Sequence, residues 1–115
     1  MIACVAIRPD GSIDTRWGRA ERVAIADISD GAIRDWEELS VDWGALRDQG
    51  SNRRHHARIA RFLRERNVQI IVAEHMGDGM LGMLETMGIA VRLDATGEAR
   101  AAATAAVAAS REVQP

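Results

Sequence analysis

The fold is decided by residues 68–93, VQIIVAEHMGDGMLGMLETMGIAVRL, which read as a strand, a helix and a second strand in succession. Residues 68–73 are short, apolar and β-branched, which predicts a strand buried on both faces in a parallel arrangement. Asp78 is expected to cap a helix over residues 78–87. Residues 89–93 predict the second strand. A strand, a helix and a strand of this kind indicate a parallel sheet with helices packed against it.

Three strands are expected before this unit. Residues 1–8, MIACVAIR, form a continuous apolar run that ends at the turn signal Pro-Asp-Gly. Residues 21–27 predict a second strand and residues 32–39 a third, joined by a tight turn at 29–31. The third strand has a polar face, so we expect it at an edge of the sheet.

Two further helices are expected. Residues 53–66 place an apolar stripe at helical spacing, with Asn52 as the N-cap. The segment before it, residues 40–52, has no clean period and is interpreted as a long connection. After residue 97, the alanine-rich tail predicts a helix of about 14 residues, because alanine has the highest helix propensity. The face of the first helix that is expected to be solvated carries Arg54, Arg58, Arg61 and Glu65.

The element order is therefore β-β-β-α-β-α-β-α, within one domain over residues 1–115. The simplest sheet has the first strand at its centre. The second and third strands lie on one side of it, and the fourth and fifth on the other. Right-handed crossovers place helices on both faces.

The composition limits the function classes. Of 115 residues, 47% are hydrophobic and 28% charged, and the net charge is −2, which excludes a multidomain enzyme and a mostly disordered chain. All 15 basic residues are arginine, a bias that fits a GC-rich genome. A pI near 5.9 argues against nucleic acid as a partner. The single cysteine excludes an internal disulfide, and no membrane or secretory segment is found, which together favour a cytoplasmic location.

A candidate site follows from the topology. In open α/β sheets, ligands bind beyond the carboxyl ends of the strands, where the strand order reverses. That point lies here between the first and fourth strands, and residues 15–19, 52–56 and 75–79 are expected to meet there. All three histidines lie in these segments. The candidate site residues are Arg16, Trp17, Gly18, Arg19, Asn52, His55, His56, His75, Met76, Gly77 and Gly79.

The side chains of these segments indicate metal or anion chemistry. His55, His56 and His75 are candidate metal ligands, because imidazole is the commonest metal ligand. The alternative for each is a solvated or backbone-bonded histidine. Arg16 and Arg19 could each hold an anion through two hydrogen bonds. Arg19 could equally fix its loop to the sheet.

Other residues favour backbone or packing roles. Gly18, Gly77 and Gly79 are interpreted as positions that need unusual backbone angles or close approach. Cys4 lies in the middle of a central strand, which favours a buried, inert thiol over a cluster ligand. Trp17 is expected to cover the site.

At these positions the sequence resembles a known family. Residues 16–27, RWGRAERVAIAD, are similar to the His-Phe-Gly-Arg-Ala segment of the dinitrogenase iron-molybdenum cofactor binding family, which leads into that family's second strand. Residues 68–93 resemble its strand, glycine-containing loop, helix and Gly-Ile-x-Val strand. With the first strand and the alanine-rich tail, the resemblance covers nearly the whole chain.

The resemblance implies a three-layer α/β/α ribonuclease H-like fold with a five-stranded mixed sheet of order 3-2-1-4-5, the second strand antiparallel to the rest. It also implies non-catalytic binding or carriage of an iron-sulfur type cofactor, such as the iron-molybdenum cofactor or its precursor, in nitrogenase-type cofactor biosynthesis. Cofactor-assembly proteins would be its partners. Arg16 and Trp17 depart from the family's histidine and phenylalanine, which exchanges a metal ligand for an anion contact. Residues 50–56 replace a glycine-rich helix start.

Two alternatives come from other function classes. Trp36 on the edge strand and the arginine-rich helix face could form a protein-interaction or regulatory surface, with a homodimer among the arrangements. Asp10 and Glu74 could support a divalent-metal hydrolase. A two-metal site, however, needs acidic residues on the first strand, which has none. The sequence also lacks GxSxG, P-loop, HExxH and CxxC motifs, so no enzymatic activity is expected.

Overall fold

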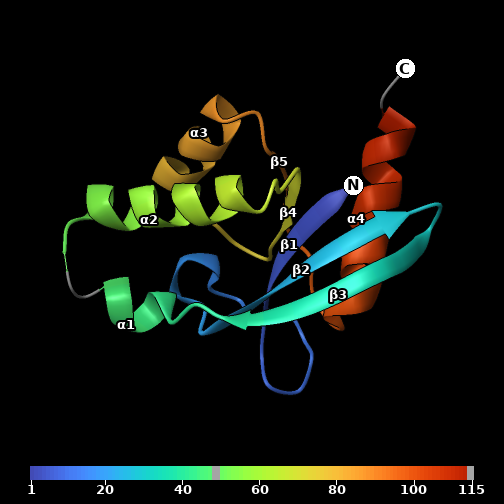
Figure 1. Ribbon diagram of the computed structural model, residues 1–115, viewed down its shortest axis with the longest axis horizontal. Coiled ribbons are helices and arrows are strands. Elements are labelled where there is room, and N and C mark those ends of the chain that lie inside the picture. Colours follow the sequence, from blue (N-terminus) through green and yellow to red (C-terminus); the bar gives the residue numbers. More distant parts are fainter. Residues whose placement is uncertain (48–49, 114–115) are drawn as a thin grey trace.

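A five-stranded mixed sheet forms the centre of the molecule in the computed structural model, which describes residues 1–47 and 50–113 (Figure 1). The strand order is β3-β2-β1-β4-β5. β1 runs parallel to β4 and β4 parallel to β5, whereas β2 is antiparallel to both of its neighbours. The predicted strand order and the antiparallel second strand are confirmed. The strands are β1 (Ile2–Ile7), β2 (Arg22–Ser29), β3 (Ala32–Ser40), β4 (Ile70–Val72) and β5 (Ala90–Arg92).

Helices cover both faces of the sheet (Figure 1). α2 (Asn52–Glu65) and α3 (Asp78–Thr86) pack on one face, and α4 (Ala99–Val113) packs on the other. α4 has few large apolar side chains, yet it packs on the sheet because its alanines allow close contact. The buried residues of α4 are Ala99, Ala103, Ala106 and Val107.

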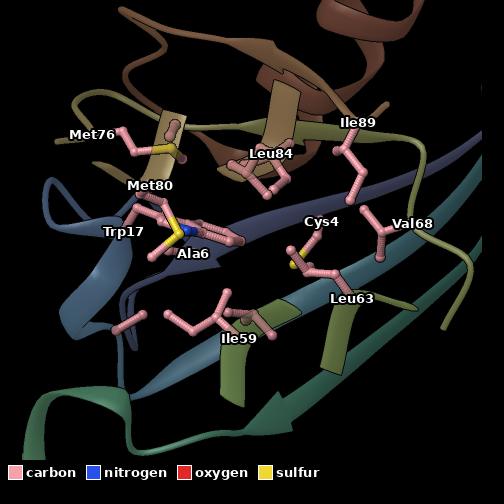
Figure 2. Close-up of a cluster of buried hydrophobic side chains, with 14 of the residues drawn as sticks. Cys4, Ala6, Trp17, Ile59, Leu63, Val68, Met76, Met80, Leu84 and Ile89 are labelled. Carbon is pink, nitrogen blue, oxygen red and sulfur yellow. The ribbon is translucent and has the colours of Figure 1, made fainter. Parts of the chain in front are cut away.

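β1 is the central strand, and its side chains alternate between two cores. Cys4 and Ala6 point into the core beneath α2 and α3, together with Leu63 and Leu84 (Figure 2). Ala3 and Val5 belong to the core on the α4 side. A strand buried on both faces must be apolar at every position, which explains the continuous apolar run that β1 shows in the sequence.

The structure corrects several local predictions. The connection at 40–52 contains a short helix, α1 (Trp43–Arg47). The side chain of Ser51, not Asn52, caps α2 by accepting a hydrogen bond from the Arg54 amide, at 3.1 Å. α3 is preceded by Gly77 and has no side-chain cap, so Asp78 lies in its first turn instead of capping it. A carboxylate there still favours the helix, through the positive end of the helix dipole.

The parallel pairing of β1 and β4 brings their carboxyl ends to one edge of the sheet. The chain after β1 leads to a 3-10 turn, η1 (Trp17–Arg19), and the chain after β4 leads to α3. The two connections touch, because the backbone of Arg16 forms an isolated parallel bridge with His75. Within residues 1–47 and 50–113, no helix combines the length and apolarity needed to cross a membrane.

Candidate functional site

A pocket of about 360 Å³ lies where the connections after β1 and β4 meet the start of α2. The three segments predicted to converge therefore do so. All eleven candidate residues line this pocket, together with two that the sequence analysis did not assign to it. The lining residues are Arg16, Trp17, Gly18, Arg19, Arg47, Asn52, His55, His56, His75, Met76, Gly77, Gly79 and Met80.

Contacts on several sides hold the η1 turn in place. The Asp14 carboxylate accepts a hydrogen bond from the Arg16 amide at 3.0 Å. The Trp43 amide donates to the Ala20 carbonyl at 2.9 Å. The Trp17 ring meets the Trp43 ring edge-on, with centroids 5.2 Å apart. Trp17 is 1% exposed, so it forms part of the core beneath the pocket instead of a cover over it.

His55 is buried, and both of its ring nitrogens have partners. Nε2 lies 2.7 Å from the Gly18 carbonyl oxygen, and Nδ1 lies 3.3 Å from an Arg58 guanidinium nitrogen. A carbonyl can only accept and a guanidinium can only donate, so the partners assign the neutral tautomer with the proton on Nε2. Burial is the main cause that lowers the pKa of His55, and the neighbouring Arg47 and Arg58 charges act in the same direction.

Arg58 corrects a second prediction, that of a simply solvated arginine face on α2. Its guanidinium contacts His55 and also donates to the Leu46 carbonyl at 3.4 Å. This arginine therefore links α2 to α1. Arg61, by contrast, is exposed and pairs with Glu65 on the same helix, as expected for the solvated face.

The other two histidines differ in their surroundings. His56 is half-buried against α3, and a Cβ placed on Gly79 would lie 3.2 Å from its ring. Gly79 is therefore a position of close approach, as predicted. Gly18 and Gly77 have neither a positive φ nor a tight contact, so that interpretation was wrong for them. His75 is exposed at the mouth of the β4–α3 connection.

Two lining residues were missed by the sequence analysis. Arg47 reaches the pocket from α1, which the sequence did not reveal because five residues are too few for a periodic stripe. The spacing of Trp43, Leu46 and Arg47 is the signal that could have indicated one helical turn. Met80 packs in the core, where it is 6% exposed, and it also lines the pocket.

The lining is basic. Arg16, Arg19 and Arg47 are among the lining residues, and none of the lining residues that the structure describes is an aspartate, glutamate or cysteine. Burial raises the pKa of the Cys4 thiol far above its usual range, and Cys4 lies in the core away from this lining. Over the described part of the chain, no group of three or more His, Cys, Asp or Glu side chains is placed to hold a metal ion.

These features suit an anionic guest more than a bare metal ion. Guanidinium groups bind anions with charge-assisted hydrogen bonds. His56, His75 and the thioethers of Met76 and Met80 add nitrogen and sulfur donors on the same lining. A larger groove of about 740 Å³ runs between β5 and α4, but it contains none of the histidines. Asp10 and Glu74 do not line the pocket either.

Comparisons with solved structures show the same fold in other proteins. The protein PH0822 has a TM-score of 0.75 and 15% sequence identity, with 95% of this chain and 92% of that one covered. The orange protein from Desulfovibrio gigas, in its apo form, has a TM-score of 0.65 and 20% identity, covering 96% and 87%. A protein described as a NifB candidate from Thermotoga has a TM-score of 0.62 and 18% identity, covering 97% and 88%.

Comparison with family models gives the more specific finding. No curated protein matches the sequence significantly. The model of the family described as dinitrogenase iron-molybdenum cofactor matches residues 1–109, which is almost the whole chain. By this match, and in agreement with the fold and the converging segments, the chain belongs to the dinitrogenase iron-molybdenum cofactor family.

Proposed function

We propose that the protein binds and carries an iron-sulfur type cofactor, of the iron-molybdenum cofactor class, in the pocket beside η1. The family match supports the cofactor class, and the structures of a NifB candidate and of an apo-form protein share the fold. The single observation that carries the proposal is the basic pocket, whose described lining residues include three arginines and three histidines and no aspartate or glutamate.

The charge of the pocket contrasts with that of the whole chain. The chain is slightly acidic, with a net charge of −2, yet the charged lining residues among positions 1–47 and 50–113 are all basic. Sulfide-bridged metal clusters carry a net charge, and their sulfur atoms accept hydrogen bonds. Arg16 suits such a guest, because its guanidinium is exposed and forms no hydrogen bond or ion pair within residues 1–47 and 50–113.

The donor set supports carriage of an assembled cluster. Cysteine thiolates hold iron-sulfur clusters permanently in most proteins, and the pocket has none. A guest held by guanidinium groups, together with His56, His75 and two thioethers, can leave without breaking thiolate bonds. A site that must release its cargo to an assembly partner needs this property. The proposal therefore includes no catalytic step.

The test is anaerobic loading with isolated iron-molybdenum cofactor. The protein is incubated with the cofactor and passed over a desalting column, and bound molybdenum and iron are measured together with the visible absorbance. The wild type is expected to retain molybdenum. Arg16→Gln and Arg47→Gln should each weaken retention about tenfold, which corresponds to the loss of roughly one charge-assisted hydrogen bond.

Arg61→Gln is the matched control, because Arg61 is an exposed arginine on α2 that pairs with Glu65 outside the pocket. It should load like the wild type. Absence of molybdenum on the wild-type protein would contradict the proposal. An equal loss in all three variants would show that general charge, and not this pocket, holds the cofactor.

A further inference from the structure

Of the three histidines in the pocket, His55 is distinguished by its contacts. It is 3% exposed, and it is the only buried polar or charged residue among the described residues. A buried polar side chain is tolerated when its hydrogen bonds are made, and both ring nitrogens of His55 make one. A metal ion could reach either nitrogen only by displacing one of these partners.

The contacts of His55 connect three parts of the pocket wall. Its Nε2 proton is donated to Gly18 in η1, and its Nδ1 accepts from Arg58 in α2. Arg58 also donates to the Leu46 carbonyl in α1. The chain Gly18–His55–Arg58–Leu46 therefore joins η1, α2 and α1. η1 and its N-cap contribute Arg19 and Arg16 to the lining, and α1 contributes Arg47.

The bond to Gly18 also affects the polarity of the pocket. A carbonyl oxygen on the rim would repel an anionic guest, and the Gly18 carbonyl is occupied by the imidazole N–H instead. Gly18 is flanked by Trp17 and Arg19, so fixing its peptide also fixes where the neighbouring guanidinium can reach. The same hydrogen bond thus removes an acceptor from the rim and orients a donor.

We infer that His55 is a positioning residue of this pocket and not a ligand of the cargo: it holds η1 in the conformation that presents the arginines. This inference rests on the proposed function for its meaning, but the geometry it describes is testable without any cofactor. It separates His55 from His56 and His75, which remain the histidines available to a guest.

The decisive comparison is His55→Gln against His55→Ala. Glutamine has an N–H donor at the ε position and a carbonyl acceptor, so it can replace both contacts, but an amide is a poor metal ligand. The first readout is hydrogen exchange of the Arg19 and Ala20 amides, which donate within η1 at 3.2 and 3.3 Å. The alanine variant should exchange these amides about tenfold faster, the effect of roughly one lost hydrogen bond, while glutamine keeps the wild-type rate.

The second readout is retention of isolated iron-molybdenum cofactor after desalting. The His55→Gln variant should retain the cofactor like the wild type, and the His55→Ala variant should retain it about tenfold less tightly. If both variants lose the cofactor equally while His55→Gln keeps the wild-type exchange rates of the Arg19 and Ala20 amides, His55 is a ligand and the inference is wrong. If alanine changes neither readout, the inference is also wrong.

Failure of the proposed function would give a different pattern. If the wild type retains no cofactor, the exchange rates alone decide the inference about His55. If His55→Ala does not fold, Arg58→Met takes its place, since it removes the donor to Nδ1 while keeping the aliphatic stem. It should raise the exchange rates of the Arg19 and Ala20 amides by a smaller factor, and unchanged rates would overturn the inference.

Discussion

At the scale of single residues, Gly44 shows how closely α1 approaches η1. A Cβ placed on Gly44 would lie 2.8 Å from the Arg19 carbonyl oxygen, a distance that requires the backbone to shift. Gly44→Ala should therefore lower the free energy of unfolding by about 1–3 kcal/mol, although alanine favours helices over glycine by roughly 1 kcal/mol. The free energy is measured by urea denaturation.

Gly82 in α3 provides the control for this prediction. It is an exposed helical glycine whose Cβ would meet nothing within 4 Å. Gly82→Ala should raise the free energy of unfolding by about 0.5–1 kcal/mol. The two substitutions are chemically identical, so changes of the same sign would contradict the close approach of α1 to η1.

The neutral state of His55 gives the protein a pH dependence in mild acid. Burial lowers its pKa in the folded protein below its ordinary value of 6.5, so the unfolded chain takes up the proton first as the pH falls. This contribution to stability is complete above about pH 6.5 and declines as the pH falls from there toward the folded pKa. Urea midpoints of the wild type should fall across this interval, and those of His55→Gln should fall less. Parallel curves for the two proteins would exclude His55 as the cause.

At the scale of elements, α4 docks through alanines where most helices use larger side chains. Ala103 is 0% exposed against the sheet, while Ala101 on the same helix is exposed. Ala103→Leu should cost about 1–3 kcal/mol of unfolding free energy through overpacking. Ala101→Leu should change it by less than about 0.5 kcal/mol. Similar effects of both on the urea midpoint would mean that α4 is not packed as described.

The elements also show what the sequence could and could not predict. The strand order follows from residues 68–93 and the central apolar strand, because strand periodicity and right-handed crossovers leave few arrangements. The short helix α1 could not be found in this way, and Arg47 was missed with it. Ser51 and Asn52 are both residue types that cap helices well, so only the hydrogen bond from the Arg54 amide to the Ser51 side chain shows which of them is the N-cap.

The candidate site was predictable in its location but not in its roles. Topology places residues 15–19, 52–56 and 75–79 at one edge of the sheet, and the pocket lining agrees. Spacing cannot show that both nitrogens of His55 are already bonded, or that Arg58 faces inward. Those facts depend on tertiary contacts between η1, α1 and α2 that no local pattern contains.

At the scale of the whole molecule, positive charge is placed where the sheet is open to a ligand. All 15 basic residues are arginine, and three of them line one pocket whose lining, as far as the structure describes it, includes no acidic residue. The rest of the surface carries charges of both signs, and some of them form ion pairs, such as Arg22 with Glu38 on the β2–β3 hairpin. We therefore propose that one basic pocket beside η1 receives the metal-sulfur cofactor.

The location of the cofactor can be measured by anomalous X-ray diffraction at the molybdenum edge, on crystals grown anaerobically with isolated iron-molybdenum cofactor. We expect a molybdenum peak inside the pocket, among Arg16, His56 and His75. A peak in the groove between β5 and α4, with none beside η1, would contradict it.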